Sequence, residues 1–173
     1  MIITAGIYKG QKVIAPNERI TRPTLSKTRM GVFNTLYSIM GDFEGKTFLD
    51  VFGGSGIMGL EALSRGFKSV KVYELNRKSA EIIKNNYKKL GLEADLTIGD
   101  SVKLLKKSNV YYDVVYIDPP YKNKMYGSVL SVINGDIIVV ESDEDISLLY
   151  NYELIKCKIY GNTKVTYLKK QTL

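Results

Sequence analysis

Short apolar segments alternate with longer segments of helical periodicity along most of this 173-residue chain. Strands are predicted for five ranges: 47–52, 69–74, 94–98, 113–117 and 136–141. Helices are expected for three ranges between the first four strands: 57–65, 77–90 and 101–107. Crossovers of this length join parallel strands and place helices on both faces of a sheet. The sequence therefore predicts an α/β, Rossmann-like fold on a mostly parallel sheet.

The two ends of the chain predict additional elements. Segments 152–159 and 163–168 flank a tight Gly161-Asn162 turn, which is typical of an antiparallel hairpin and brings the expected sheet to seven strands. Residues 2–15 are expected to form a short β-hairpin arm around Gly10.

A helix is expected after residue 24, capped by Thr24 or Ser26. Its apolar stripe repeats at helical spacing and predicts core packing: Val32, Phe33, Leu36, Ile39 and Met40. We therefore divide the chain into an N-terminal basic β arm, residues 1–21, and one domain, residues 22–173, long enough to bury about 70% of its unfolded surface.

Composition excludes several kinds of site and location. Cys157 is the only cysteine and histidine is absent, so neither a disulfide framework, a Cys/His zinc site nor histidine acid–base catalysis is possible. We expect no metal. The chain has no apolar stretch of the roughly 18 residues that span a membrane and no signal-peptide pattern at its start. A cytoplasmic protein with no membrane partner is expected.

Positive charge is concentrated at the two ends. Residues 1–40 hold six Lys/Arg and one Glu, and residues 154–173 hold five Lys and no acid, against a net charge of +7 overall. Basic ends around a mildly acidic core suit a protein whose ends bind phosphate. We predict RNA contacts from the following residues: Lys9, Lys12, Arg22, Lys27 and Arg29. A merely solubilising role is the alternative.

The tetrapeptide Asp118-Pro119-Pro120-Tyr121 directly follows an apolar strand segment. The two prolines stiffen the backbone and remove two donors, which leaves carbonyl groups free to accept hydrogen bonds. Asp118 and the Pro119 carbonyl could hold the two hydrogens of a base amine while Tyr121 stacks on the base. These three residues are the candidate catalytic groups. A proline-rich turn with a surface tyrosine is the alternative.

A glycine-rich turn follows the first predicted strand. Gly54, Gly56 and Gly59 satisfy the GxGxxG dinucleotide fingerprint, and Glu74 ends the next strand at the spacing of a ribose-binding acid. However, Asp50 stands three residues before Gly53 and would repel a pyrophosphate. A cofactor with cationic groups and no phosphate, S-adenosylmethionine (SAM), fits better. A tight turn that needs small residues is the structural alternative.

Together these motifs resemble the class I SAM-dependent methyltransferases. The resemblance implies that Gly54 and Gly56 shape the methionine pocket beside Asp50, that Glu74 binds the ribose hydroxyls and that Asp100 lies near the adenine amine. Asp100 is also the middle residue of a Gly-Asp-Ser pattern typical of a helix N-cap.

A narrower resemblance extends over nearly the full chain. Five segments in order are similar to bacterial 16S ribosomal RNA guanine-N(2) methyltransferases of the RsmD type: 3–10, 22–29, 32–36, 139–142 and 160–165. That family more often has alanine at the position of Gly53 and an acidic residue at that of Ser26, and the stretch between Tyr121 and Asp136 is short. The resemblance implies methylation of the 2-amino group of a guanine in small-subunit ribosomal RNA, with the RNA or the ribosomal particle as partner of a monomeric enzyme.

Three other functions share some of these features. A DNA amino-methyltransferase uses similar Asp-Pro-Pro-Tyr chemistry but usually has a larger target-recognition region. A protein or small-molecule methyltransferase needs no basic arm. A non-catalytic ribosome-associated RNA-binding module would be expected to lose Asp50, Glu74 or Asp118, and all three are present.

Overall fold

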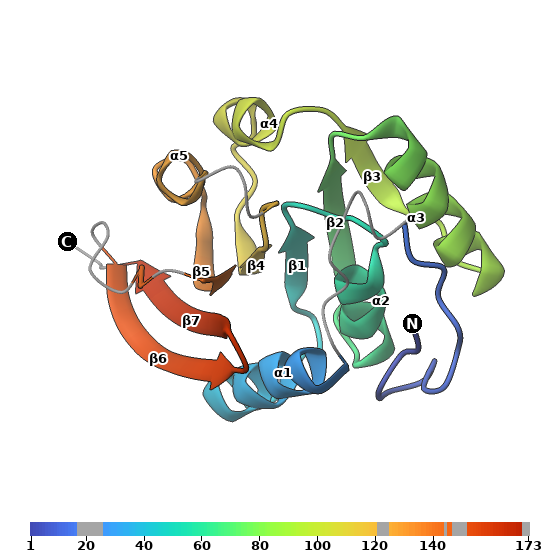
Figure 1. Cartoon of the computed structure of the whole chain (residues 1–173), viewed down its shortest axis with the longest axis horizontal. Helices are drawn as coiled ribbons and strands as arrows, with labels where there is room; N and C mark the ends of the chain where they lie inside the picture. Colours follow the sequence, from blue (N-terminus) through green and yellow to red (C-terminus); the bar gives the residue numbers. More distant parts are fainter. Residues whose placement is uncertain (17–25, 121–124, 144, 147–151, 171–173) are drawn as a thin grey trace.

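The computed structural model describes residues 1–16, 26–120, 125–143, 145–146 and 152–170 (Figure 1). Helices and strands alternate through it in this order: α1 Ser26–Met40, β1 Thr47–Asp50, α2 Ile57–Ser64, β2 Ser69–Glu74, α3 Arg77–Lys89, β3 Asp95–Ile98, α4 Ser101–Lys107, β4 Tyr112–Ile117, α5 Tyr126–Leu130, β5 Gly135–Ser142, β6 Tyr152–Tyr160 and β7 Thr163–Lys170. All the predicted strands of the sheet and all the predicted helices are present within one or two residues of the expected bounds.

The strands form one seven-stranded sheet with the order β3-β2-β1-β4-β5-β7-β6. β1 to β5 are parallel, whereas β7 runs antiparallel to both β5 and β6. This is the predicted α/β, Rossmann-like class I methyltransferase topology with a C-terminal antiparallel hairpin. The strand order reverses between β1 and β4, and ligands bind at the carboxyl ends of strands beside such a reversal.

Helices cover both faces of the sheet. One face packs on α1, α2 and α3 through buried side chains such as Phe33, Leu60 and Ile83. The other face packs on α4 and α5 through Leu105 and Val129, and Figure 1 shows α4 and α5 across the sheet from α1. The sheet is therefore held rigidly from both sides, which fixes the positions of its strand ends.

The apolar stripe predicted for the first helix is confirmed: Val32, Phe33 and Leu36 are fully buried in α1, and Ile39 and Met40 pack against the same core. Thr24 lies outside the described residues. Ser26 is the first residue of the helix rather than the residue before it.

The predicted N-terminal hairpin is reduced to one antiparallel β-bridge, Ile2 to Lys12, and no strand forms there. The chain does reverse direction, because the Gly10 N–H donates to Ile3 O over 2.9 Å and the Ile3 N–H donates to Gln11 O over 3.0 Å. Two positive φ angles, at Gly6 and Gly10, bend this segment away from a regular ladder.

Residues 1–16 pack on the domain instead of extending from it. Ile3 and Val13 are buried in the same core as α1 and α2. The Ile7 N–H donates to Ser64 O over 2.8 Å, and the side chain of Asn86 on α3 both accepts from and donates to the backbone of Ile14, each over 2.9 Å. The domain boundary at residue 21 remains a prediction, but the described part of the arm contributes to the core of the fold.

Candidate active site

Carboxylates follow the ends of four neighbouring parallel strands. Asp50 ends β1, Glu74 ends β2, Asp100 comes two residues after β3, and Asp118 directly follows β4. Because carboxyl ends of parallel strands meet at one edge of the sheet, the fold brings these predicted site residues to the same edge. The reversal of strand order between β1 and β4 lies in their midst.

The glycine-rich turn between β1 and α2 is held by backbone hydrogen bonds. The Gly53 N–H donates to Tyr73 O over 2.8 Å and the Gly56 N–H donates to Gly53 O over 2.7 Å. Gly54 and Gly56 have φ angles of 57° and 78°, which L side chains rarely adopt. At Gly53 a Cβ atom would lie 2.4 Å from Val72 Cγ1. This close packing explains why glycine stands where the similar family often has alanine.

Glu74 bridges the turn and the start of α3. Its Oε2 accepts the Gly54 N–H over 2.8 Å, and its Oε1 accepts the Asn76 N–H over 2.7 Å. The Gly54 donor is thus already engaged by a carboxylate, which disfavours a pyrophosphate at this turn. Carboxylate oxygens can also accept ribose hydroxyls, so Glu74 fits the sugar of SAM.

Asp50 is 1% exposed at the end of the central strand. Burial raises its pKa to about 7; the hydrogen bond from the Phe52 N–H, 3.3 Å from Oδ1, opposes this rise, whereas the nearby carboxylates of Glu74 and Glu141 add to it. A cationic group brought to this position would favour the ionised carboxylate. The residues around Asp50 therefore fit the charge of a methionine ammonium or sulfonium better than that of a phosphate.

Asp100 caps α4, because its Oδ1 accepts the Lys103 N–H over 2.9 Å. The next residue joins this helix to the central strand, since Ser101 Oγ donates to Val51 O over 2.7 Å. The N-cap interpretation of the Gly-Asp-Ser pattern is thus confirmed. A contact of Asp100 with adenine stays a prediction, and the cap places its side chain at the correct edge for it.

The tetrapeptide begins at the end of β4. Asp118 is half-buried, Pro119 is buried and Pro120 is exposed, while Tyr121 lies outside the described residues. Tyr116, two residues before Asp118, pairs with Asp50 in the parallel ladder. Asp118 therefore follows the strand adjacent to the one that ends in Asp50, across the strand reversal from it.

The residues predicted to bind RNA differ in their positions. Lys9, Lys12 and Lys27 are exposed, and Arg22 lies outside the described residues. The prediction for Arg29 is wrong, because its side chain is 1% exposed. Its guanidinium lies 3.5 Å from the carboxylate of Glu61 and donates to Ile2 O over 2.8 Å. Arg29 is a buried counter-ion that ties α1 to α2 and the arm.

A buried pair beside the site was not predicted. The Tyr116 hydroxyl donates to Glu141 Oε1 over 2.5 Å, and both residues are almost fully buried. Burial raises the pKa of Glu141, while the Tyr116 hydrogen bond and the charge of Arg29 oppose that rise. The only signal in the sequence was a glutamate at the end of the apolar run Ile137–Val140.

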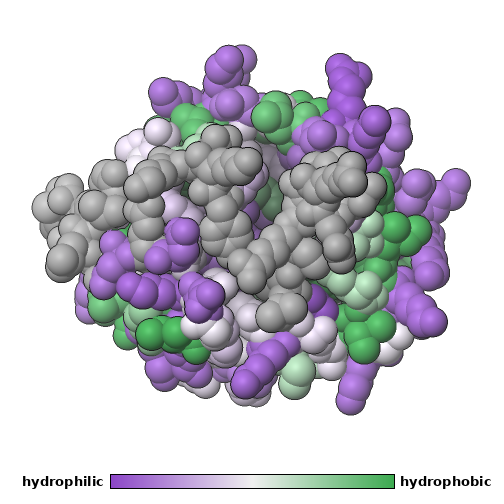
Figure 2. All heavy atoms as spheres, viewed as in Figure 1, coloured by the Kyte–Doolittle hydropathy of each residue, from purple (hydrophilic) through white to green (hydrophobic). Residues whose placement is uncertain are grey.

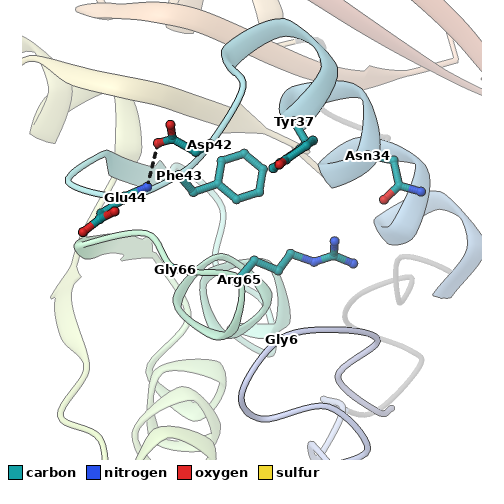
Figure 3. Close-up of a pocket in the computed structure, with 8 residues that line it drawn as sticks. All are labelled: Gly6, Asn34, Tyr37, Asp42, Phe43, Glu44, Arg65 and Gly66. Atoms are coloured by element: carbon teal, nitrogen blue, oxygen red, sulfur yellow. Dashed lines mark hydrogen bonds between the residues drawn. The ribbon is translucent and has the colours of Figure 1, made fainter.

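A pocket of about 740 Å³ lies at the opposite edge of the sheet (Figure 3). Tyr37 and Phe43 face the Arg65 side chain across the pocket. Tyr37 is near the end of α1, Phe43 precedes β1 and Arg65 precedes β2. Arg65 already binds Glu61 Oε2 and Thr4 Oγ1, over 3.2 and 3.0 Å. The pocket is therefore remote from the strand ends that carry the predicted site.

Among the described residues, no group of three or more potential ligands from Cys, Asp and Glu could hold a metal ion. None of the helices in the described part of the chain is long and apolar enough to cross a membrane.

Several proteins with known descriptions are similar to this chain over most of their length. The chain is 30% identical over 186 residues to the "Putative rRNA methyltransferase YlbH" of Bacillus subtilis. This match covers 99% of this chain and 100% of that protein. It is 31% identical to ribosomal RNA small subunit methyltransferase D of Haemophilus influenzae, over 92% of this chain and 88% of the relative. The structure described as "Putative methyltransferase yhhF from Escherichia coli" superposes with a TM-score of 0.85 at 25% identity, covering 99% of both chains.

A family model described as "Conserved hypothetical protein 95" matches residues 1–169, which include the glycine-rich turn, the Asp-Pro-Pro-Tyr segment and the C-terminal hairpin. The chain therefore belongs to this family, that of the RsmD-type methyltransferases, as the resemblance of its motifs predicted.

Proposed function

We propose that this protein transfers a methyl group from SAM to the exocyclic 2-amino group of a guanine in small-subunit (16S) ribosomal RNA. The observation that carries the proposal is the meeting of Asp50, Glu74 and Asp118 at one edge of the sheet, on both sides of the strand reversal. The RNA substrate is inferred from the ribosomal RNA methyltransferases among the relatives. A cytoplasmic location follows from that substrate.

The cofactor side of the site would be formed by β1 and β2. Asp50 would face the cationic methionine part, Gly54 and Gly56 would line it with backbone atoms, and Glu74 would accept the ribose hydroxyls. SAM, when bound there, supplies a methyl group activated by its positively charged sulfur. No step requires a metal, because the leaving sulfur becomes neutral as the methyl group departs.

The acceptor side would be formed by the end of β4. Asp118 and the Pro119 carbonyl accept hydrogen bonds from the two N–H groups of the base amine. These bonds orient the nitrogen toward the methyl group. As the bond to carbon forms, positive charge develops on that nitrogen, and the carboxylate of Asp118 stabilises it. The nitrogen then loses one proton, to Asp118 or to water. Catalysis on this scheme consists mainly of positioning.

Exposed cations on the surface of the protein would hold the RNA. Lys9 and Lys12 on the arm, Lys27 at the start of α1 and Arg22 are the candidates from the sequence. Hydrophilic side chains also project over α3 and α4 (Figure 2), and α4 includes three lysines: Lys103, Lys106 and Lys107. Because duplex RNA hides its base edges, we expect the target guanine to lie in a single-stranded loop, with Tyr121 stacked on it.

A DNA amino-methyltransferase is the second candidate, since the chemistry at Asp118 would be the same. Mapping methylated guanines in ribosomal RNA from cells with and without this protein separates the two candidates. Loss of one 2-methylguanine from small-subunit RNA is the expected result. Unchanged ribosomal RNA together with loss of a methylated base in DNA would favour the second candidate.

The role of Asp118 is tested by Asp118→Ala with purified protein and ribosomal RNA. Single-turnover methylation should fall by about 100-fold or more, while SAM affinity changes by no more than a few fold. Asp136→Ala is the matched control, because Asp136 is an exposed aspartate near the start of β5, at the opposite edge of the sheet. A near-normal rate for Asp118→Ala would refute the proposed acceptor side.

A further inference from the structure

A buried hydrogen bond joins the ends of β4 and β5 beside the candidate active site. The Tyr116 hydroxyl lies 2.5 Å from Glu141 Oε1, and the two residues are 1% and 4% exposed. Neither takes part in the chemistry proposed above. Glu141 is thus a buried ionisable group whose presence needs another explanation.

The ladder places this pair beside Asp50 on one strand and beside Asp118 at the end of another. Ile117 pairs with Val140, so Glu141, which lies within β5, is at the level where Asp118 follows β4. β4 lies between β5 and β1, and its residue Tyr116 pairs with Asp50 of β1. The carbonyl of Tyr116 also accepts the Val51 N–H over 3.0 Å. Tyr116 is therefore bonded to the strand that carries Asp50 and stands two residues before Asp118.

Packing alone does not favour a glutamate at position 141. Burial of a carboxylate is costly unless charges and hydrogen bonds compensate for it, and the preceding residues Val139 and Val140 fill the interior with apolar side chains. The compensation comes from the Tyr116 hydroxyl and from the positive charge of Arg29, itself buried against Glu61. Two elements, α1 through Arg29 and β4 through Tyr116, thus contribute groups that accommodate this carboxylate.

We propose that Glu141 is a positioning residue for methyl transfer: by fixing the Tyr116 hydroxyl it holds the end of β4, and with it Asp118 and the Pro119 carbonyl, in line with the cofactor side. The inference rests on the proposed function. A displacement of about 1 Å between reacting groups can cost about 100-fold in rate, so a bond that fixes a strand end has a large effect without touching the substrate.

Three variants separate positioning from proton transfer. Glu141→Gln keeps an oxygen that can accept the Tyr116 hydroxyl, Glu141→Ala removes it, and Tyr116→Phe removes the donor. Positioning predicts that Glu141→Ala and Tyr116→Phe lower the single-turnover rate by about 10- to 100-fold, whereas Glu141→Gln stays within a few fold of the unaltered protein. The loss should appear in kcat, with the KM for RNA and the Kd for SAM nearly unchanged.

Tyr152→Phe is the matched control. It removes a tyrosine hydroxyl that donates to Leu130 O over 2.8 Å, at the start of β6 and away from the carboxyl edge. Thermal melting is measured for every variant, and Tyr116→Phe, which changes one atom, keeps the test decisive if Glu141→Ala does not fold.

Two results would overturn the inference. A rate for Tyr116→Phe equal to that of Tyr152→Phe would leave the pair with a purely structural role. A rate for Glu141→Gln as low as that of Glu141→Ala would show that the negative charge, not the hydrogen bond, is required. Absence of RNA methylation by the unaltered protein would instead refute the proposed function, which keeps the two failures distinct.

Discussion

Glu74 Oε2 accepts the Gly54 N–H over 2.8 Å, so the last residue of β2 shapes the turn that follows β1. The same carboxylate accepts the Asn76 N–H through its other oxygen. One side chain thus fixes both the glycine-rich turn and the entry into α3, the two segments between which a ribose would lie.

Replacement of this side chain should weaken SAM binding directly. For Glu74→Ala we expect a loss of about 1.5–3 kcal/mol, because hydrogen bonds to a charged group are removed from both the ribose and the turn. Calorimetry with purified protein measures it. Glu81→Ala, on the exposed side of α3, is the control and should leave the affinity unchanged. Tight NADH binding without any response to SAM would restore the dinucleotide interpretation.

The raised pKa of Asp50 predicts a pH dependence of SAM binding. Cationic groups prefer the ionised carboxylate, so affinity should rise with pH toward about 7 and level off above it. Well below 7 the dependence should approach tenfold per pH unit. Calorimetry in buffers of different ionisation enthalpy should detect proton release on binding near pH 7. Asp50→Asn should bind more weakly and without this dependence; the same slope in that variant would assign the titration to another group.

Asp50 should also make the stability of the fold depend on pH. The sign is opposite to that for SAM binding, because stability should fall as pH rises. Its pKa is 3.8 as an ordinary value and about 7 in the folded protein, so the folded state holds the proton more tightly. The free energy of unfolding should therefore fall as pH rises from about 4 to 7. In Asp50→Asn this part of the pH dependence should vanish from denaturant unfolding curves.

The buried Arg29–Glu61 pair predicts a large loss of stability on removal of one partner. Arg29→Met should lower the free energy of unfolding by about 3–5 kcal/mol, since Glu141 and Glu61 lose a buried positive charge. The arm should loosen as well, because the Thr4 N–H donates to Glu61 Oε1 over 2.7 Å. Denaturant unfolding and amide exchange at Thr4 measure the two effects. Arg77→Met, at an exposed position on α3, is the control, and equal stability of the two variants would contradict the prediction.

The arm lysines are best tested by substitution, because deletion of the arm would remove the buried Ile3 and Val13 from the core. If Lys9 and Lys12 each contact a phosphate, Lys9→Gln with Lys12→Gln should lower the slope of log affinity against log salt by about 1.4, at roughly 0.7 per contact. RNA binding at several salt concentrations measures the slope. Lys46→Gln with Lys68→Gln, beside the starts of β1 and β2, is the matched control. An unchanged slope would favour a solubilising arm.

The sheet and its helices could be predicted because each strand and each long helix shows its own periodicity within a few residues. The helix α5 could not, since its five residues Tyr126–Leu130 are too few to complete a recognisable period. The carboxylates at the strand ends were also predictable, because a parallel sheet brings the residues after its strands to one edge. The positions of these carboxylates depend only on the local sequence and on the order of the strands in the sheet.

Other features depend on partners distant in the sequence. Arg29 looks like any other cation of the basic N-terminal region, and it is buried only because Glu61, 32 residues later, reaches it from α2. Tyr116 and Glu141 are 25 residues apart and meet through the register of β4 and β5. Neither partner could be identified without the packing of the helices and the ladder of the sheet.

The position of β7 between β5 and β6 has a consequence for synthesis on the ribosome. All but one of the residues of β5 are buried, yet the strand that covers one side of it comes last in chain order. A nascent chain that has completed β5 thus presents an apolar, hydrogen-bonding edge to other chains. The turn at Gly161, with φ of 60°, allows β6 and β7 to pair locally and dock as one hairpin, which shortens this period of exposure.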